Sequence, residues 1–90
     1  MDNEIDLTVN KINRQIEPLF RKERNTLYHF RVVGTPFTEK YNIFFEWHKI
    51  NHSTISRQVG SYSKRNSKYI DEFVQSLERA TGVSVQLLLQ

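Results

Sequence analysis

The chain has 90 residues, with 13 Lys and Arg against 10 Asp and Glu, and its formal net charge is +3. This length fits one domain spanning residues 1–90, and a hydrophobic fraction of 38% supplies a core, which excludes a disordered chain. The absence of cysteine excludes a disulfide framework and a cysteine-bound zinc site. No apolar run has the length of a membrane span, and the opening residues do not resemble a signal peptide. We therefore expect a cytoplasmic protein that does not contact a membrane.

The first predicted element is an amphipathic helix over residues 3–16. Apolar side chains recur there at helical spacing, at Ile5, Val9, Ile12 and Ile16. Pro18 follows, and a prolyl ring clashes with the preceding turn of a helix. The helix is therefore expected either to kink near Glu17 or to restart at Pro18.

Three strands are expected after the charged run RKERN. The segment TLYHFRVVG (26–34) alternates aromatic or β-branched side chains with polar ones, which is typical of a strand. Gly34 and Pro36 then supply a turn, and KYNIFFEWHKI (40–50) predicts a second strand antiparallel to the first. The segment STISRQVGSY (53–62) fits either a strand or a helix, and we favour a strand.

A second helix is predicted over residues 67–82, with Ser67 as its N-terminal cap and Gly82 as its C-terminal stop. The alternation in VSVQLLLQ (83–90) predicts a last strand. The complete order is helix, strand, strand, strand, helix, strand. It predicts an α+β fold in which a small antiparallel sheet of three to four strands is packed by an N-terminal and a C-terminal helix.

Charge is segregated along the chain. Residues 49–68 contain five Lys and Arg and no Asp or Glu, which leaves the rest of the chain net acidic by two charges. Such a segment favours a polyanion, because Lys and Arg bind phosphates and nearby hydroxyls and amides add neutral donors. We expect a non-catalytic, accessory or regulatory nucleic-acid-binding domain, with a duplex favoured. Its predicted contacts are Lys49, Asn51, Arg57, Ser63, Lys64, Arg65 and Lys68.

Other interpretations of these features stay open. The basic segment also fits a solvated loop or a contact with an acidic protein surface, so the chain could be an adaptor or inhibitor that binds through its sheet edge and aromatic residues. A strand at 83–89 could pair across a two-fold axis in a homodimer. We interpret the aromatic side chains as core rather than as a base-stacking platform, namely Tyr28, Phe30, Tyr41, Phe45 and Trp47.

Catalysis is not expected, because the sequence shows no Gly-rich phosphate loop, no triad and no carboxylate pair. In an extended chain, roughly 13 Å would separate His48 from His52, too far for one shared metal ion, so we expect neither metal nor cofactor. His29 is expected to be a surface or hydrogen-bonded residue. A third interpretation is a toxin-like, metal-independent ribonuclease that uses His48, His52, Arg57 and Tyr62.

One partial resemblance covers about half of the chain. The order helix, three strands, helix, with GTPFTEKYNIFFE (34–46) and then GSYSKRNSK (60–68), resembles the double-stranded RNA-binding domain. The resemblance implies that Lys64, Arg65 and Lys68 contact phosphates. The sequence departs from this family at Phe37, near the place where the family turn usually has a histidine, and in its continuation into VSVQLLLQ.

A second fragment is similar to a different family. STISRQV (53–59), with the later LERATGVSVQLLL (77–89), resembles the recognition helix and closing helices of repressor-type helix-turn-helix domains. This resemblance implies that a helix presents Ser53, Thr54, Ser56, Arg57 and Gln58 to DNA. Both resemblances point to nucleic acid, and they imply different folds.

Overall fold

The computed structural model describes residues 3–89. It begins with helix α1 (Asn3–Ile16), followed by strands β1 (Thr26–Gly34), β2 (Lys40–Lys49) and β3 (Ile55–Ser63). A short 3-10 helix, η1 (Lys64–Tyr69), then leads into helix α2 (Ile70–Thr81) and strand β4 (Val85–Leu89). The segment at 53–62 is therefore mostly strand, as favoured. The recognition helix that the helix-turn-helix resemblance implies for residues 53–59 is not formed, so that prediction is wrong.

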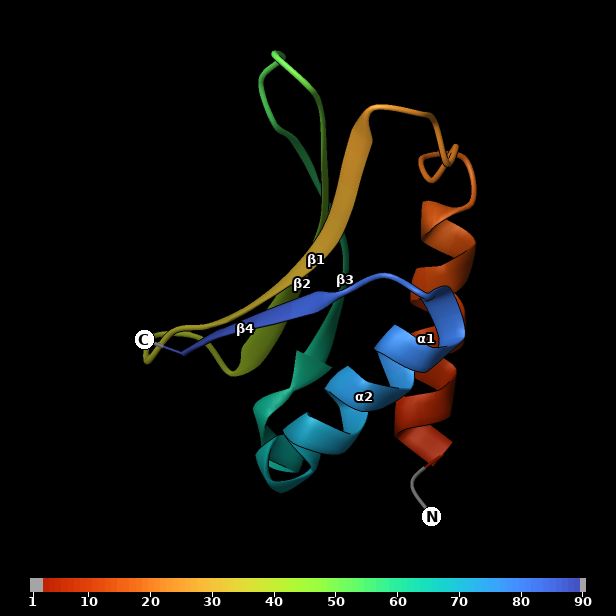
Figure 1. Ribbon diagram of the computed structural model, residues 1–90. Helices are drawn as coiled ribbons and strands as arrows, with labels where there is room; N and C mark the ends of the chain where they lie inside the picture. The colour runs from red at the N-terminus through yellow and green to blue at the C-terminus, as the bar shows by residue number, and fades with distance from the viewer. Residues whose placement is uncertain (1–2, 90) are drawn as a thin grey trace.

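The four strands form one sheet in the order β3-β2-β1-β4 (Figure 1). β2 is antiparallel to both β1 and β3, whereas β4 is parallel to β1. The α+β class and the predicted order of helices and strands are confirmed. The sheet is mixed rather than antiparallel throughout, and the connection before β4 explains why.

Helix α2 sets the direction of β4. β1 and β3 run the same way because each is antiparallel to β2. The 12-residue α2 carries the chain back across the sheet, so the next strand starts from the same end as β3 and runs parallel to β1. Gly82, with φ of 71°, ends α2 in the left-handed conformation, and its backbone N–H donates to the carbonyl of Glu78.

Both helices pack on one face of the sheet, with α1 against β3 and α2 and with α2 against β4 (Figure 1). The core between the layers consists of Ile5, Val9, Ile12, Ile16, Phe30, Val32, Tyr41, Ile43, Phe45, Val59, Tyr62, Phe73, Leu77 and Val83. The interpretation of the five aromatic residues as core is confirmed, because Tyr28 and Trp47, the two that are not fully buried, pack against it. Within residues 3–89, no helix covers the opposite face of the sheet, which we call the open face.

The helix ends differ from the sequence prediction in two details. The predicted cap at Ser67 is wrong, because Ser67 lies inside η1, whose cap is Ser63: the Ser63 hydroxyl accepts a hydrogen bond from the Arg65 backbone N–H at 3.2 Å. α1 ends at Ile16 without restarting at Pro18, and the next residues form a turn. Within the described range, no helix is long and apolar enough to cross a membrane.

Candidate functional site

The residues predicted to bind nucleic acid lie at both ends of β3. Lys49 ends β2 and Asn51 lies in the β2–β3 turn, whereas Ser63, Lys64 and Arg65 lie at the far end of β3, after nine residues of strand, or roughly 30 Å. Arg57 lies between the two groups. The fold thus brings Ser63, Lys64 and Arg65 together and leaves Lys49 and Asn51 at the opposite end of the sheet.

The first cleft, called the η1 cleft, has a volume of about 730 Å³ and is formed where the β1–β2 turn meets η1. Its lining residues are Glu4, Pro36, Thr38, Glu39, Lys40, Ser63, Lys64 and Arg65. The Lys64 backbone N–H donates to the Glu39 carbonyl at 2.9 Å, and its ammonium donates to the carbonyl of Thr35. Lys64 therefore ties η1 to the turn, while Lys40 and Arg65 are exposed.

The second cleft, called the α1–β3 groove, runs between the first helix and the edge strand and has a volume of about 470 Å³. Its lining residues are Thr8, Lys11, Ile12, Arg14, Gln15, Val59, Gly60 and Ser61. None of the described residues that line it is Asp or Glu, and Lys11 and Arg14 are exposed. The charged side chains among the described lining residues of this groove are therefore both cationic.

Two features of β3 shape this groove. The pairing with β2 shifts at Val59, which is an extra residue between Gln58 and Gly60, as in a β-bulge. At Gly60, an added Cβ would lie 3.0 Å from Cγ1 of Ile12, so the missing side chain lets α1 approach the strand closely.

Arg57 pairs with the core residue Phe45, and its side chain therefore leaves the strand on the same face as α1.

The cations of the groove were missed by the sequence analysis. Lys11 and Arg14 lie outside residues 49–68, yet they belong to a second acid-free run, residues 7–16. The helical spacing of Thr8, Lys11 and Gln15 would have placed these residues on one side of the helix. That this side faces β3 depends on the tertiary packing and was not visible in the sequence.

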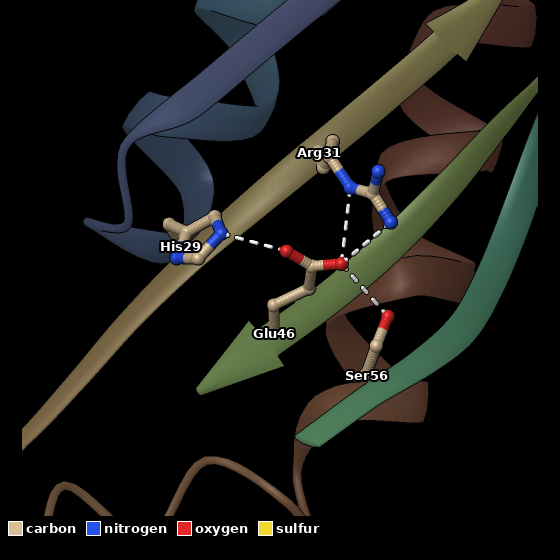
Figure 2. A network of polar contacts seen from close by, with 4 residues as sticks. All are labelled: His29, Arg31, Glu46 and Ser56. Atoms are coloured by element: carbon tan, nitrogen blue, oxygen red, sulfur yellow. Dashed lines mark hydrogen bonds and ion pairs between the residues drawn. The ribbon is translucent and has the colours of Figure 1, made fainter. Parts of the chain in front are cut away.

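A buried carboxylate lies at the centre of the open face. Glu46 of β2 is 8% exposed and receives hydrogen bonds from β1 and β3 (Figure 2). Arg31 contacts Oε2 through Nε at 3.0 Å and Nη2 at 2.8 Å, and the Ser56 hydroxyl donates to the same oxygen at 2.9 Å. His29 Nε2 lies 2.8 Å from Oε1, so the expectation that His29 is hydrogen-bonded is confirmed.

The electrostatics of this cluster favour a charged Glu46. Burial alone would raise the pKa of the carboxyl, but hydrogen bonds from Ser56 and His29 and the charge and hydrogen bond of Arg31 outweigh it. The pKa of Glu46 is therefore lower than its ordinary value. Arg31 is paired with Glu46, and its guanidinium carbon also lies 5.3 Å from the Phe44 ring centroid. The cluster joins three strands, β1, β2 and β3, through one carboxylate.

The residues of the ribonuclease interpretation are not assembled. His48 and His52 line one small cleft with Trp47 at the β2–β3 turn, whereas the Tyr62 side chain is buried in the core near the other end of β3. Among the described residues, no group of three or more His, Asp or Glu side chains could hold a metal ion.

Comparisons with protein-family models, with curated proteins and with solved structures found no match. The order α1, β1, β2, β3, α2 agrees with the order that the double-stranded RNA-binding resemblance implies, and β4 is an addition to it.

Proposed function

We propose that this chain is a cytoplasmic, non-catalytic nucleic-acid-binding domain that contacts the phosphates of a duplex along α1, β3 and the start of η1. The observation that carries the proposal is the α1–β3 groove, in which Lys11 and Arg14 are exposed and the described lining residues include no carboxylate. Cations in such a groove release counterions from a phosphate backbone, which drives binding.

The adjoining η1 cleft extends this basic surface. Both clefts have walls from α1 and from β3 with η1, so their cations lie along one flank of the molecule. These cations are Lys11, Arg14, Lys40, Lys64 and Arg65, with Arg57 on the strand beside them. Glu4 and Glu39 reduce the net charge at the η1 end. The strongest phosphate contacts are therefore expected in the α1–β3 groove.

The lining of the groove favours a duplex over a single strand. Proteins that bind single strands usually stack bases on exposed aromatic rings. None of the described residues lining the α1–β3 groove is aromatic, and its neutral members include Thr8, Gln15 and Ser61. Hydroxyls and amides beside Lys and Arg are the groups that contact phosphates and sugars and fix a protein on a duplex.

Fluorescence anisotropy with labelled DNA duplex, RNA duplex and single strands tests the proposal. If four to six phosphates are contacted, affinity for the preferred duplex should fall by a factor on the order of 10² to 10³ between about 50 and about 200 mM salt. Replacing both groove cations, Lys11→Glu with Arg14→Glu, should weaken binding roughly 100-fold at low salt and lower the salt slope by about two.

A matched control has the same change in charge at positions that line neither cleft, Lys22→Glu with Arg79→Glu, and it should retain most of the affinity. Lys49→Glu tests the far end of the sheet and should have little effect, because Lys49 lies at the opposite end of β3 from the η1 cleft. Equal losses in the two double variants, which change the charge by the same amount, would indicate a response to net charge and would contradict a specific groove. If no nucleic acid binds at low salt, the proposed function is contradicted.

A protein contact is the second candidate, and one observation favours it. Phe37 is 93% exposed in the β1–β2 turn, between Pro36 and Thr38, which line the η1 cleft. An exposed aromatic ring in a turn that borders a cleft lined by Lys40 and Arg65 fits an acidic protein surface with an apolar pocket. If nucleic acids fail to bind, this turn becomes the first surface to examine, with Phe37→Ser as the variant expected to abolish partner binding.

A further inference from the structure

The outer edge of β4 is an uncharged strand edge. The sequence of β4 is VQLLL, and no other strand of the described chain pairs with its outer side. Leu89 is 64% exposed, and Leu87 and Leu88 are half-buried. Native proteins usually protect a free edge with charged residues, a bulge or proline, because unpaired backbone groups recruit another strand. β4 contains no charged residue and no proline, and its register with β1 is regular.

Hydrogen bonds at the start of β4 show which backbone groups face outward. The Ser84 carbonyl accepts from the Phe30 N–H at 2.9 Å, so the backbone groups of Ser84 face β1. The next N–H, of Val85, donates instead to Oε2 of Glu78 at 3.0 Å. Because these directions alternate along a strand, the N–H and C=O groups of Leu87 and Leu89 face the free side.

We propose that a second copy of this chain pairs with this edge, β4 against β4, antiparallel about a two-fold axis at Leu88. Leu87 of each copy would then exchange two hydrogen bonds with Leu89 of the other, and the two copies of Leu88 would face each other on the open face. This register leaves the Val85 N–H bonded to Glu78. Centring the axis on Leu87 would instead pair Val85 with Leu89 and disrupt the bond to Glu78.

The chemistry of the β4 edge favours a second copy of this chain as the partner that pairs with it. A two-fold axis makes the contact isologous, so every outward group of Leu87 and Leu89 finds its complement in the same strand of the partner. β4 carries no charge that would select a charged peptide. Pairing of two short strands buries a small area, so the dimer should be weak, with a dissociation constant in the range of about 10 µM to about 1 mM. This proposal is independent of nucleic-acid binding.

Analytical ultracentrifugation over that concentration range tests for the dimer. The wild-type chain should shift from monomer to dimer, and Leu88→Lys should keep it monomeric by placing two ammonium groups at the axis. Leu27→Lys is the control for an added charge on the open face, because Leu27 is exposed there and belongs to the start of β1, which β4 does not reach. A wild-type monomer throughout, or a dimer insensitive to Leu88→Lys, would overturn the proposal.

Cysteine cross-linking tests the register with smaller substitutions. The chain contains no cysteine, so Leu88→Cys gives a single thiol at the axis. A facing pair of this type has a Cα separation of about 4.5 Å, which a disulfide can span. Two copies of Gln86→Cys, on the same face of the strand, would be roughly 14 Å apart. Under mild oxidation, Leu88→Cys should cross-link at least tenfold faster than Gln86→Cys; equal rates would contradict the axis at Leu88.

Discussion

The two outer strands of the sheet differ in their protection against pairing with another strand. β3 has the extra residue Val59, a cation at Arg57, and α1 packed alongside, all of which hinder another strand from pairing with it. β4 is regular and uncharged, and Gln86 is its one polar side chain. Pairing with another strand is therefore hindered at the β3 edge and not hindered by any charge or bulge of the described β4 edge.

Removing the bulge in β3 is expected to change both folding stability and self-association. Deleting Val59 would leave Gln58 and Gly60 in regular alternation and make this edge as flat as β4. Deletion and Val59→Ala should both cost about 2 kcal/mol of unfolding free energy, because each removes a buried apolar side chain. Only the deletion should also cause self-association, measured by sedimentation in a Leu88→Lys background. A monomeric deletion variant would show that the bulge does not protect the edge.

Glu46→Gln tests how the exposed start of β3 is held to the sheet. The substitution should cost about 2 kcal/mol in chemical denaturation at pH 7, because Arg31, His29 and Ser56 lose a charged acceptor. The folded-state pKa of Glu46 is lowered, so its stabilisation is present above the ordinary value of 4.5 and is lost as pH falls through the folded pKa. Between pH 7 and pH 3, the wild type should lose more stability than the variant. Parallel pH profiles would contradict this account.

Gly82 sets the backbone direction between the end of α2 and the start of β4. With φ of 71° and open space around the position of a Cβ, Gly82→Ala should cost about 1 kcal/mol of unfolding free energy through backbone strain alone. Gly82→Asn should cost less, because Asn adopts the left-handed conformation more readily. Thermal denaturation of both variants measures the difference. A larger loss for Asn than for Ala would point to side-chain contacts that the structure does not contain.

The smallest expected effect on folding comes from Leu89→Lys. Leu89 is 64% exposed, so the unfolding free energy should change by less than about 0.5 kcal/mol. Self-association should nevertheless weaken, since the charge lies in the proposed strand pair. Sedimentation and denaturation on the same sample separate the two quantities. If association is unchanged while stability is retained, β4 is not the contact.

Much of the fold could be predicted because its periodicities are local. The spacing of Ile5, Val9, Ile12 and Ile16 is enough to place α1, and the alternation in residues 26–34 is enough to place β1. The direction of β4 could not be read in the same way, because it depends on the path of α2 across the sheet. The 3-10 start of the second helix was also missed, since Ser67 and Ser63 are equally good caps by residue type.

The candidate site was less predictable than the fold. The acid-free segment was visible in the sequence, but β3 is extended, and its length separates Lys49 from Arg65. Lys11 and Arg14 belong to the site only because Gly60 lets α1 approach β3. The Glu46 cluster likewise depends on the β1–β2 register, which pairs His29 with Glu46 across the strands. Sequence patterns locate cations, and tertiary contacts decide which of them share a surface.

The position of Trp47 gives the chain an optical probe of its own. It is the one tryptophan in the sequence, it is half-buried, and it lies 5.6 Å from the Phe45 ring between Tyr28 of β1 and Ile55 of β3. Its emission therefore reports on the end of the sheet that holds the β2–β3 turn. A ligand seated on η1 should leave this fluorescence nearly constant, whereas one seated against His48 and His52 should quench or shift it.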